Sequence, residues 1–202
     1  MNIHRAVLGS LFAACVAVIL SGAAAAADDG SRPPTPTVEQ WIDWGSRVHG
    51  GFGVLIAMGI RVGVDALARL GAARREVDVT YFDSPSTPCP CVVDGVMVAV
   101  SASPGQKNLR IATEPAAPGY FGEVLVRHRR SGDAVRYCLR AETLSRLLEG
   151  QALKDLRARY DLVNNMAAAS LYEIVAGDGR CVRDAGADGA DTSTDAARAA
   201  PN

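Results

Sequence analysis

The stretch GVLIAMGIRVGVDALARLGA, residues 53–72, constrains the fold of this 202-residue chain more than any other segment. It has three charged residues, which recur every four positions: Arg61, Asp65 and Arg69. They form one narrow polar stripe on an otherwise apolar helix, so we predict a helix buried on most sides, in the domain or against a partner. Gly59 and Gly63 lie one turn apart and would let another backbone approach closely. This glycine face also favours self-association.

The remaining periodicities predict an α+β fold. Thr37 is suited to the N-cap of a first helix, and residues 76–83 alternate like a strand. Residues 91–102 are ambiguous, because their valines favour a strand while a helix would place Cys91 and Asp94 on one face. Three further strands are expected, at 108–113, 121–130 and 134–140, and residues 141–175 are expected to be mainly helical. We predict a single domain whose helices pack on a mainly antiparallel or mixed β-sheet.

Both ends of the chain differ in composition from the middle. Residues 1–27 have a basic start, an apolar run and small residues, which is typical of a secretory signal peptide. We predict a Pro-rich linker at 28–37, the folded domain at 38–177 and a disordered Ala/Asp/Gly-rich tail at 178–202. The expected location is periplasmic or secreted, where disulfides are chemically allowed.

Composition excludes several classes of function. The formal net charge of −1 gives no whole-chain case for binding nucleic acid or an anionic membrane. After signal cleavage no second apolar run is long enough to span a membrane. The sequence has no phosphate loop, dinucleotide fingerprint or nucleophile elbow. We therefore expect that the protein is a binding protein rather than an enzyme.

The segment STPCPC places Cys89 and Cys91 one residue apart. A metal site, a reducible disulfide, a reactive thiol and simple packing all remain open, and Cys138 could instead pair with Cys181. His49 lies where a helix meets glycines, so it either faces a cavity or is satisfied by a backbone partner. Two thiolates and an imidazole would suffice for an open zinc, copper or nickel site.

A second histidine, His128, lies in the basic segment VRHRRSG. One interpretation is a solvated sheet edge that resists aggregation. The other is an anion-binding patch.

Two segments together resemble the core of the FmdE-like family, which takes its name from one component of archaeal formylmethanofuran dehydrogenase. They are RVHGGFGVLIAMGIRVG and, some forty residues later, CVVDGVMVAVSASPGQKNL, and the similarity extends from about residue 40 to the segment ASLYEIVA at 169–176. The positions that match the family pattern are His49, Gly50, Gly59, Arg61, Cys91, Asp94, Ser103, Gly105, Asn108 and Leu109.

The resemblance implies an α+β fold, frequent homodimers and a metal such as zinc held by His and Cys residues. On this basis we expect His49 and Cys91 to be metal ligands and Cys89 to compensate for a lost one. The expected pocket or ligand-orienting residues are Gly50, Asp94, Ser103 and Asn108.

The sequence also departs from the family pattern. The usual second histidine is Gly51, the usual cysteine and proline are Gly53 and Val54, and a further cysteine is Ala102. A metal-free, degenerate domain that binds a small organic ligand or a protein partner is therefore the alternative function.

Overall fold

A computed structural model describes residues 35–182 of the chain. The predicted signal peptide, residues 28–34 of the linker and residues 183–202 of the predicted tail lie outside these residues. The helices are α1 (Val38–His49), α2 (Val54–Leu70), α3 (Cys91–Val100), α4 (Leu144–Glu149), α5 (Leu156–Asn165) and α6 (Ala168–Leu171). The strands are β1 (Val77–Asp83), β2 (Leu109–Ile111), β3 (Tyr120–His128), β4 (Ala134–Arg140) and β5 (Tyr172–Ala176), with short 3-10 turns at Pro104–Gln106, Ala141–Thr143 and Gly150–Ala152.

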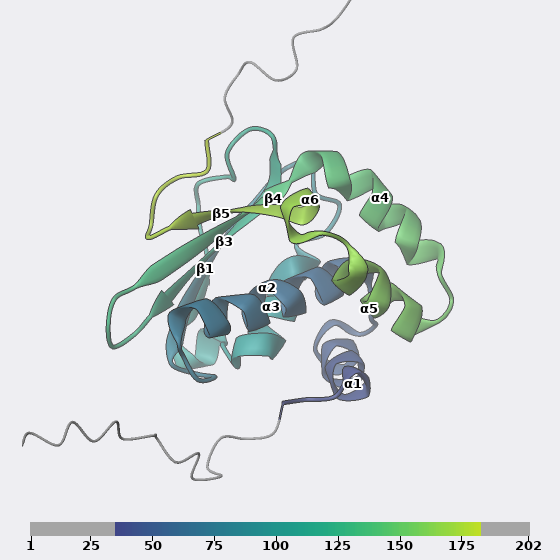
Figure 1. The fold of residues 1–202 in the computed structure, drawn as a ribbon, viewed down its shortest axis with the longest axis horizontal. Coiled ribbons are helices and arrows are strands. Elements are labelled where there is room, and N and C mark those ends of the chain that lie inside the picture. Colours follow the sequence, from purple (N-terminus) through teal and green to yellow (C-terminus); the bar gives the residue numbers. More distant parts are fainter. Residues whose placement is uncertain (1–34, 183–202) are drawn as a thin grey trace, which may run out of the picture. The chain divides into compact units, whose positions relative to one another are not determined.

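The strands form one mixed sheet in the order β2-β1-β3-β4-β5, covered on one face by α2 and α3 (Figure 1). The β1–β2 pair is parallel and the other pairs are antiparallel. Val77, Val79 and Tyr81 are fully buried on the helix side, as the alternation in β1 predicted. The predicted α+β class with a mixed sheet is confirmed.

The end of the predicted helical region is wrong. Residues 172–175 were expected to be helical, but Tyr172–Ala176 form the edge strand β5. This strand pairs with β4, with Tyr137 opposite Ile174 and Leu139 opposite Tyr172. The residues form a strand because β4 offers an unpaired edge, and this edge exists only once the sheet has formed.

The ambiguous segment 91–102 is resolved as a helix, α3, which stacks on α2 (Figure 1). Gly59 of α2 faces Gly95 of α3, and a Cβ built on Gly59 would lie only 2.9 Å from the Gly95 Cα. Gly63 faces Ala99 one turn further along. The predicted close approach of a backbone is confirmed, but the approaching helix belongs to the same chain. This glycine face is therefore occupied within the chain, and self-association stays a prediction.

The polar stripe of α2 is used inside the domain. Arg61 donates hydrogen bonds to the carbonyl oxygens of Val163 and Met166, at the end of α5. Asp65 accepts a hydrogen bond of 2.7 Å from the Tyr137 hydroxyl on β4. The stripe therefore joins α2 to the sheet and to the C-terminal helices.

Thr37 is the N-cap of α1, as its sequence position predicted, and its side chain forms a capping box with Gln40. The chain then reverses sharply, and α1 and α2 are bent by 117°. Within residues 35–182 no single helix is long and apolar enough to cross a membrane; only this bent pair passes such a test, by length and composition.

The sheet face opposite α2 holds a buried ion pair and a disulfide. Arg136 and Glu123 are 2.5 Å apart and almost fully buried. Cys138 is bonded to Cys181, which is 4% exposed. The described chain therefore continues past the predicted domain boundary at 177, and its last residues are attached to β4.

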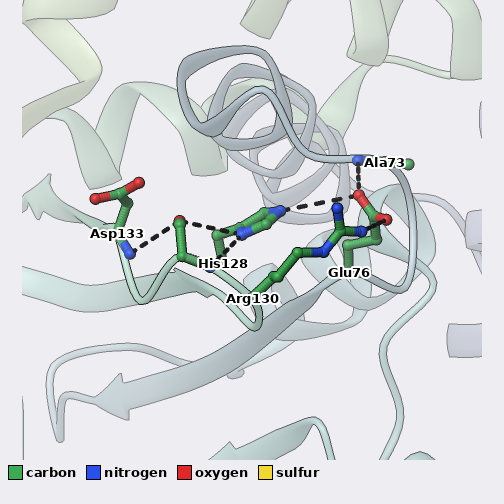
Figure 2. Close-up of polar contacts among 6 residues, drawn as sticks. Ala73, Glu76, His128, Arg130 and Asp133 are labelled. Carbon is green, nitrogen blue, oxygen red and sulfur yellow. Dashed lines mark hydrogen bonds and ion pairs between the residues drawn. The ribbon is translucent and has the colours of Figure 1, made fainter.

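The β3–β4 hairpin carries His128, whose Nδ1 accepts a hydrogen bond of 3.0 Å from the Ser131 N–H (Figure 2). Its Nε2 lies 3.9 Å from Glu76. The neighbouring arginines are paired with acids: Arg127 with Asp178, Arg129 with Asp78 and Arg130 with Glu76. Because β3 and β4 are inner strands, the prediction of a sheet edge is wrong. The acids also neutralise the expected anion-binding patch.

Candidate metal centre

His49 is the last residue of α1, and its position depends on the glycines that follow. Gly50 adopts a left-handed conformation with φ of 86°, which ends the helix and turns the chain toward α2. The His49 Nδ1 lies 2.7 Å from Asp94 Oδ2, and each side chain is about a third exposed, at 33% and 30%. A carboxylate at Nδ1 favours a proton there, so the lone pair of Nε2 is left for a metal.

Cys91 and Asp94 come from the start of α3. Cys91 is its first residue, after Pro90 at the N-cap, and Asp94 lies in the first turn. The spacing of three residues places both on one face of the helix, as predicted for the helical alternative. Cys89 precedes this helix in the rigid Pro88–Pro90 segment.

The ligand atoms of His49, Cys89 and Cys91 lie within 4.8 Å of one another. Around a shared zinc ion, the Sγ and Nε2 atoms of such ligands would be roughly 3.5–3.8 Å apart, so the two sulfurs, which are bonded to each other in this structure, would have to be reduced and separate to form the site. Imidazole and thiolate are the donors that zinc prefers. The three residues therefore fit a metal site with one open coordination position.

The structure joins Cys89 to Cys91 in a disulfide, and Cys138 to Cys181. The sequence alone left both pairings open. A disulfide sulfur is not a thiolate, and the thiolate is the form that binds zinc. Disulfide and metal complex are therefore alternative states of the same pair of cysteines.

A cleft of about 490 Å³ opens beside these residues. It is lined by His49, Gly50, Gly51, Phe52, Gly53, Val54, Leu55, Ile56, Pro88, Cys89, Cys91, Leu148, Gln151 and Arg159. Gly50 thus lies in the pocket, where the sequence placed it. The walls are mostly apolar, and none of the lining residues is a carboxylate.

Sequence reasoning missed the residues that close the far side of the cleft. Arg159 donates hydrogen bonds to the backbone carbonyls of Phe52, Gln151 and Leu153. The Gln151 side chain accepts a hydrogen bond of 3.1 Å from the Val54 N–H, at the start of α2. The contacts of Arg159 with Phe52 and of Gln151 with Val54 join segments about a hundred residues apart, and no local pattern could have indicated them.

Ser103 and Asn108, predicted as pocket residues, are not among the residues that line the cleft. They follow the C-terminal end of α3, while Cys91 begins it, and ten helical residues span roughly 15 Å. Asn108 is 2% exposed; it accepts a hydrogen bond from the Ser103 N–H and donates one to the Val77 carbonyl oxygen. Both residues fix the loop between α3 and β2.

A comparison with curated proteins finds no match. A family model does match: "FmdE, Molybdenum formylmethanofuran dehydrogenase operon", over residues 48–185. This range covers more than half of the chain and includes His49, Cys89, Cys91 and Asp94. With this match, and an α+β fold that brings a His/Cys group together, the chain belongs to the FmdE family.

Proposed function

We propose that this protein binds one divalent transition-metal ion, with zinc as the first choice, through His49 and the thiolates of Cys89 and Cys91. The observation that carries the proposal is the grouping of their three ligand atoms within 4.8 Å of one another. Asp94 supports it, because a carboxylate behind a metal-binding histidine fixes the orientation and the tautomer of the ring.

Three protein ligands leave the fourth zinc position free, and here that position would face the cleft. A bound zinc ion would supply a Lewis acid there. Apart from His49, the lining residues offer no Asp, Glu or His side chain to transfer a proton. The site is therefore better suited to holding a metal and a small ligand than to turnover.

The test is the metal content of the protein, made with its own N-terminal segment and isolated without chelator. The protein is reduced anaerobically with a phosphine, incubated with excess zinc and freed of unbound metal before the measurement. About one zinc per chain is expected by elemental analysis. His49→Ala should lose it. His128→Ala is the matched control, because it removes a histidine outside the cleft and should retain the metal. Equal zinc in both variants would refute the proposed site.

Export to the periplasm or outside the cell is part of the proposal and rests on the N-terminal sequence pattern. Mass spectrometry of the mature protein should show a chain that begins after residue 26 or 27. A cytoplasmic chain that keeps its first residues would contradict export.

Homodimerisation is also proposed. It rests on the family resemblance alone, because the Gly59/Gly63 face packs against α3 of the same chain and is not free for a second copy. Light scattering at micromolar concentration should report twice the chain mass. A monomer would overturn this part of the proposal.

The second candidate function is a metal-free domain that binds a small organic ligand or a protein partner. The Cys89–Cys91 disulfide and the apolar walls of the cleft favour it. A thermal-shift screen separates the two functions. Stabilisation by small molecules, with no effect of zinc on the reduced protein, would favour this candidate.

A further inference from the structure

The two disulfides lie in different surroundings. Cys138 and Cys181 are 0% and 4% exposed, and Tyr120 packs with them. Cys89 and Cys91 are partly exposed, and both line the cleft. A thiol reductant can therefore reach the second pair from the solvent, whereas the first pair is accessible only after the C-terminal segment detaches.

The two disulfides also differ in what they hold together. The Cys138–Cys181 bond joins residues 43 positions apart and ties the C-terminal segment to β4, while the Cys89–Cys91 bond joins residues two positions apart. A crosslink stabilises a fold more when it closes a longer loop. Opening the short loop should therefore leave the fold intact.

The accessible pair supplies two of the three ligands of the proposed metal site. We propose that the Cys89–Cys91 disulfide is a reversible redox gate on this site: a dithiol reductant opens it, and only the reduced pair takes up zinc. This inference rests on the proposed metal function and adds its regulation. The reductant is identified by chemical class as a dithiol, small or protein-borne, that performs thiol–disulfide exchange.

The exchange proceeds in two steps. A thiolate of the dithiol attacks one sulfur of the Cys89–Cys91 bond, which gives a mixed disulfide and releases the other cysteine as a thiolate. The second thiolate of the reductant then resolves the mixed disulfide. Two electrons pass to the protein, and the reductant leaves as a disulfide. Zn²⁺ binds the two cysteine thiolates, and the two protons of the dithiol are released.

Position favours Cys91 as the leaving group and Cys89 as the sulfur that is attacked. Cys91 is the first residue of the ten-residue helix α3, where the positive end of the helix dipole stabilises a thiolate. The departing Cys91 thiolate would already lie beside His49, where the metal is expected. Reduction and metal capture therefore occur at one place.

The experiment treats the oxidised, full chain with graded amounts of a dithiol, in parallel with and without zinc. Free thiols are alkylated and located by mass spectrometry. In a separate portion that is not alkylated, the dithiol is removed and zinc is titrated against a chromophoric chelator. The expected result is that Cys89 and Cys91 are alkylated before Cys138 and Cys181, and that zinc binding appears together with these first thiols. The buried disulfide is the internal control, so the mapping needs no variant.

Cys89→Ser provides a second, independent readout. This variant cannot form the gate disulfide, so its zinc affinity should be weaker than that of the reduced parent but unaffected by oxidation. The parent should lose zinc binding when it is oxidised.

Each contrary outcome has a distinct meaning. Equal zinc binding by oxidised and reduced chains would overturn the gate and leave the metal function standing. Opening of Cys89–Cys91 no earlier than Cys138–Cys181 would also overturn the gate. Absence of zinc binding in a folded chain with free Cys89 and Cys91 would overturn the metal function, and the gate with it.

Discussion

The crossing of α2 and α3 at Gly59 and Gly95 gives the sharpest test of the link between packing and the metal site. A Cβ on Gly59 would overlap the Val92 carbonyl oxygen and lie 2.8 Å from the Val96 nitrogen. These are backbone atoms, so no side-chain rotation relieves the overlap. In Gly59→Ala the two helices must separate by about 1 Å to restore normal contact distances.

The magnitude follows from two opposing terms. Alanine favours a helix over glycine by about 1 kcal/mol. Overpacking of a close-packed core costs about 3 kcal/mol when the backbone itself has to shift. The net loss is about 2 kcal/mol in the free energy of unfolding, which lowers Tm by roughly 4–8 °C for a domain of this size.

The same displacement should weaken zinc binding. Cys91 and Asp94 belong to α3, whereas His49 is joined to α2 by four residues. Separating the two helices therefore increases the distance between His49 and both Cys91 and Asp94. The assays are thermal unfolding by circular dichroism and zinc competition on the reduced protein. Gly105→Ala is the control, because its nearest contact would be the Ser103 hydroxyl at an ordinary 3.8 Å. An unchanged or raised Tm in Gly59→Ala would refute the reasoning.

Three further predictions follow from individual contacts. Asp94→Asn should weaken zinc binding of the reduced protein about 10-fold, because it removes the charge 2.7 Å from His49 Nδ1. The control Asp43→Asn removes a carboxylate from an exposed ion pair on α1 and should leave the zinc affinity unchanged; equal affinities in the two variants would contradict the role of Asp94. Glu123→Gln should cost about 3 kcal/mol of folding free energy, measured by urea denaturation, because it leaves the buried Arg136 without its counter-charge; a loss no larger than that of Asp43→Asn would contradict this. Burial raises the pKa of Tyr81 and Tyr137, and the Asp65 hydrogen bond raises that of Tyr137 further. The folded chain therefore holds these phenolic protons more tightly than the unfolded chain, so the contribution of the two phenols to stability should be complete below about pH 10 and be lost above it. A denaturation midpoint that stays constant between about pH 9 and pH 11 would contradict this.

Most of the fold could be predicted from local patterns, because the elements concerned carry their own signals. The single polar stripe of α2, the alternation in β1 and the capping residue Thr37 each specify an element by periodicity or by a backbone hydrogen bond. Local patterns failed where the secondary structure of one element depends on its packing against another. The valine-rich α3 is helical because Gly95 packs against Gly59, and Tyr172–Ala176 is a strand because β4 has a vacant edge.

For the site, the sequence by itself determined the donor residues. The glycines after His49, the paired cysteines and Asp94 one turn after Cys91 are local features, and the family resemblance adds to them. The tertiary structure alone decided which residues meet. It brought His49 to Asp94 across 45 positions, placed Arg159 and Gln151 on the far wall of the cleft, and left Ser103 and Asn108 at the other end of α3. The physical reason is that hydrogen-bond distances and burial depend on how helices pack and where loops close. Such contacts between distant segments produce no periodic pattern in the sequence.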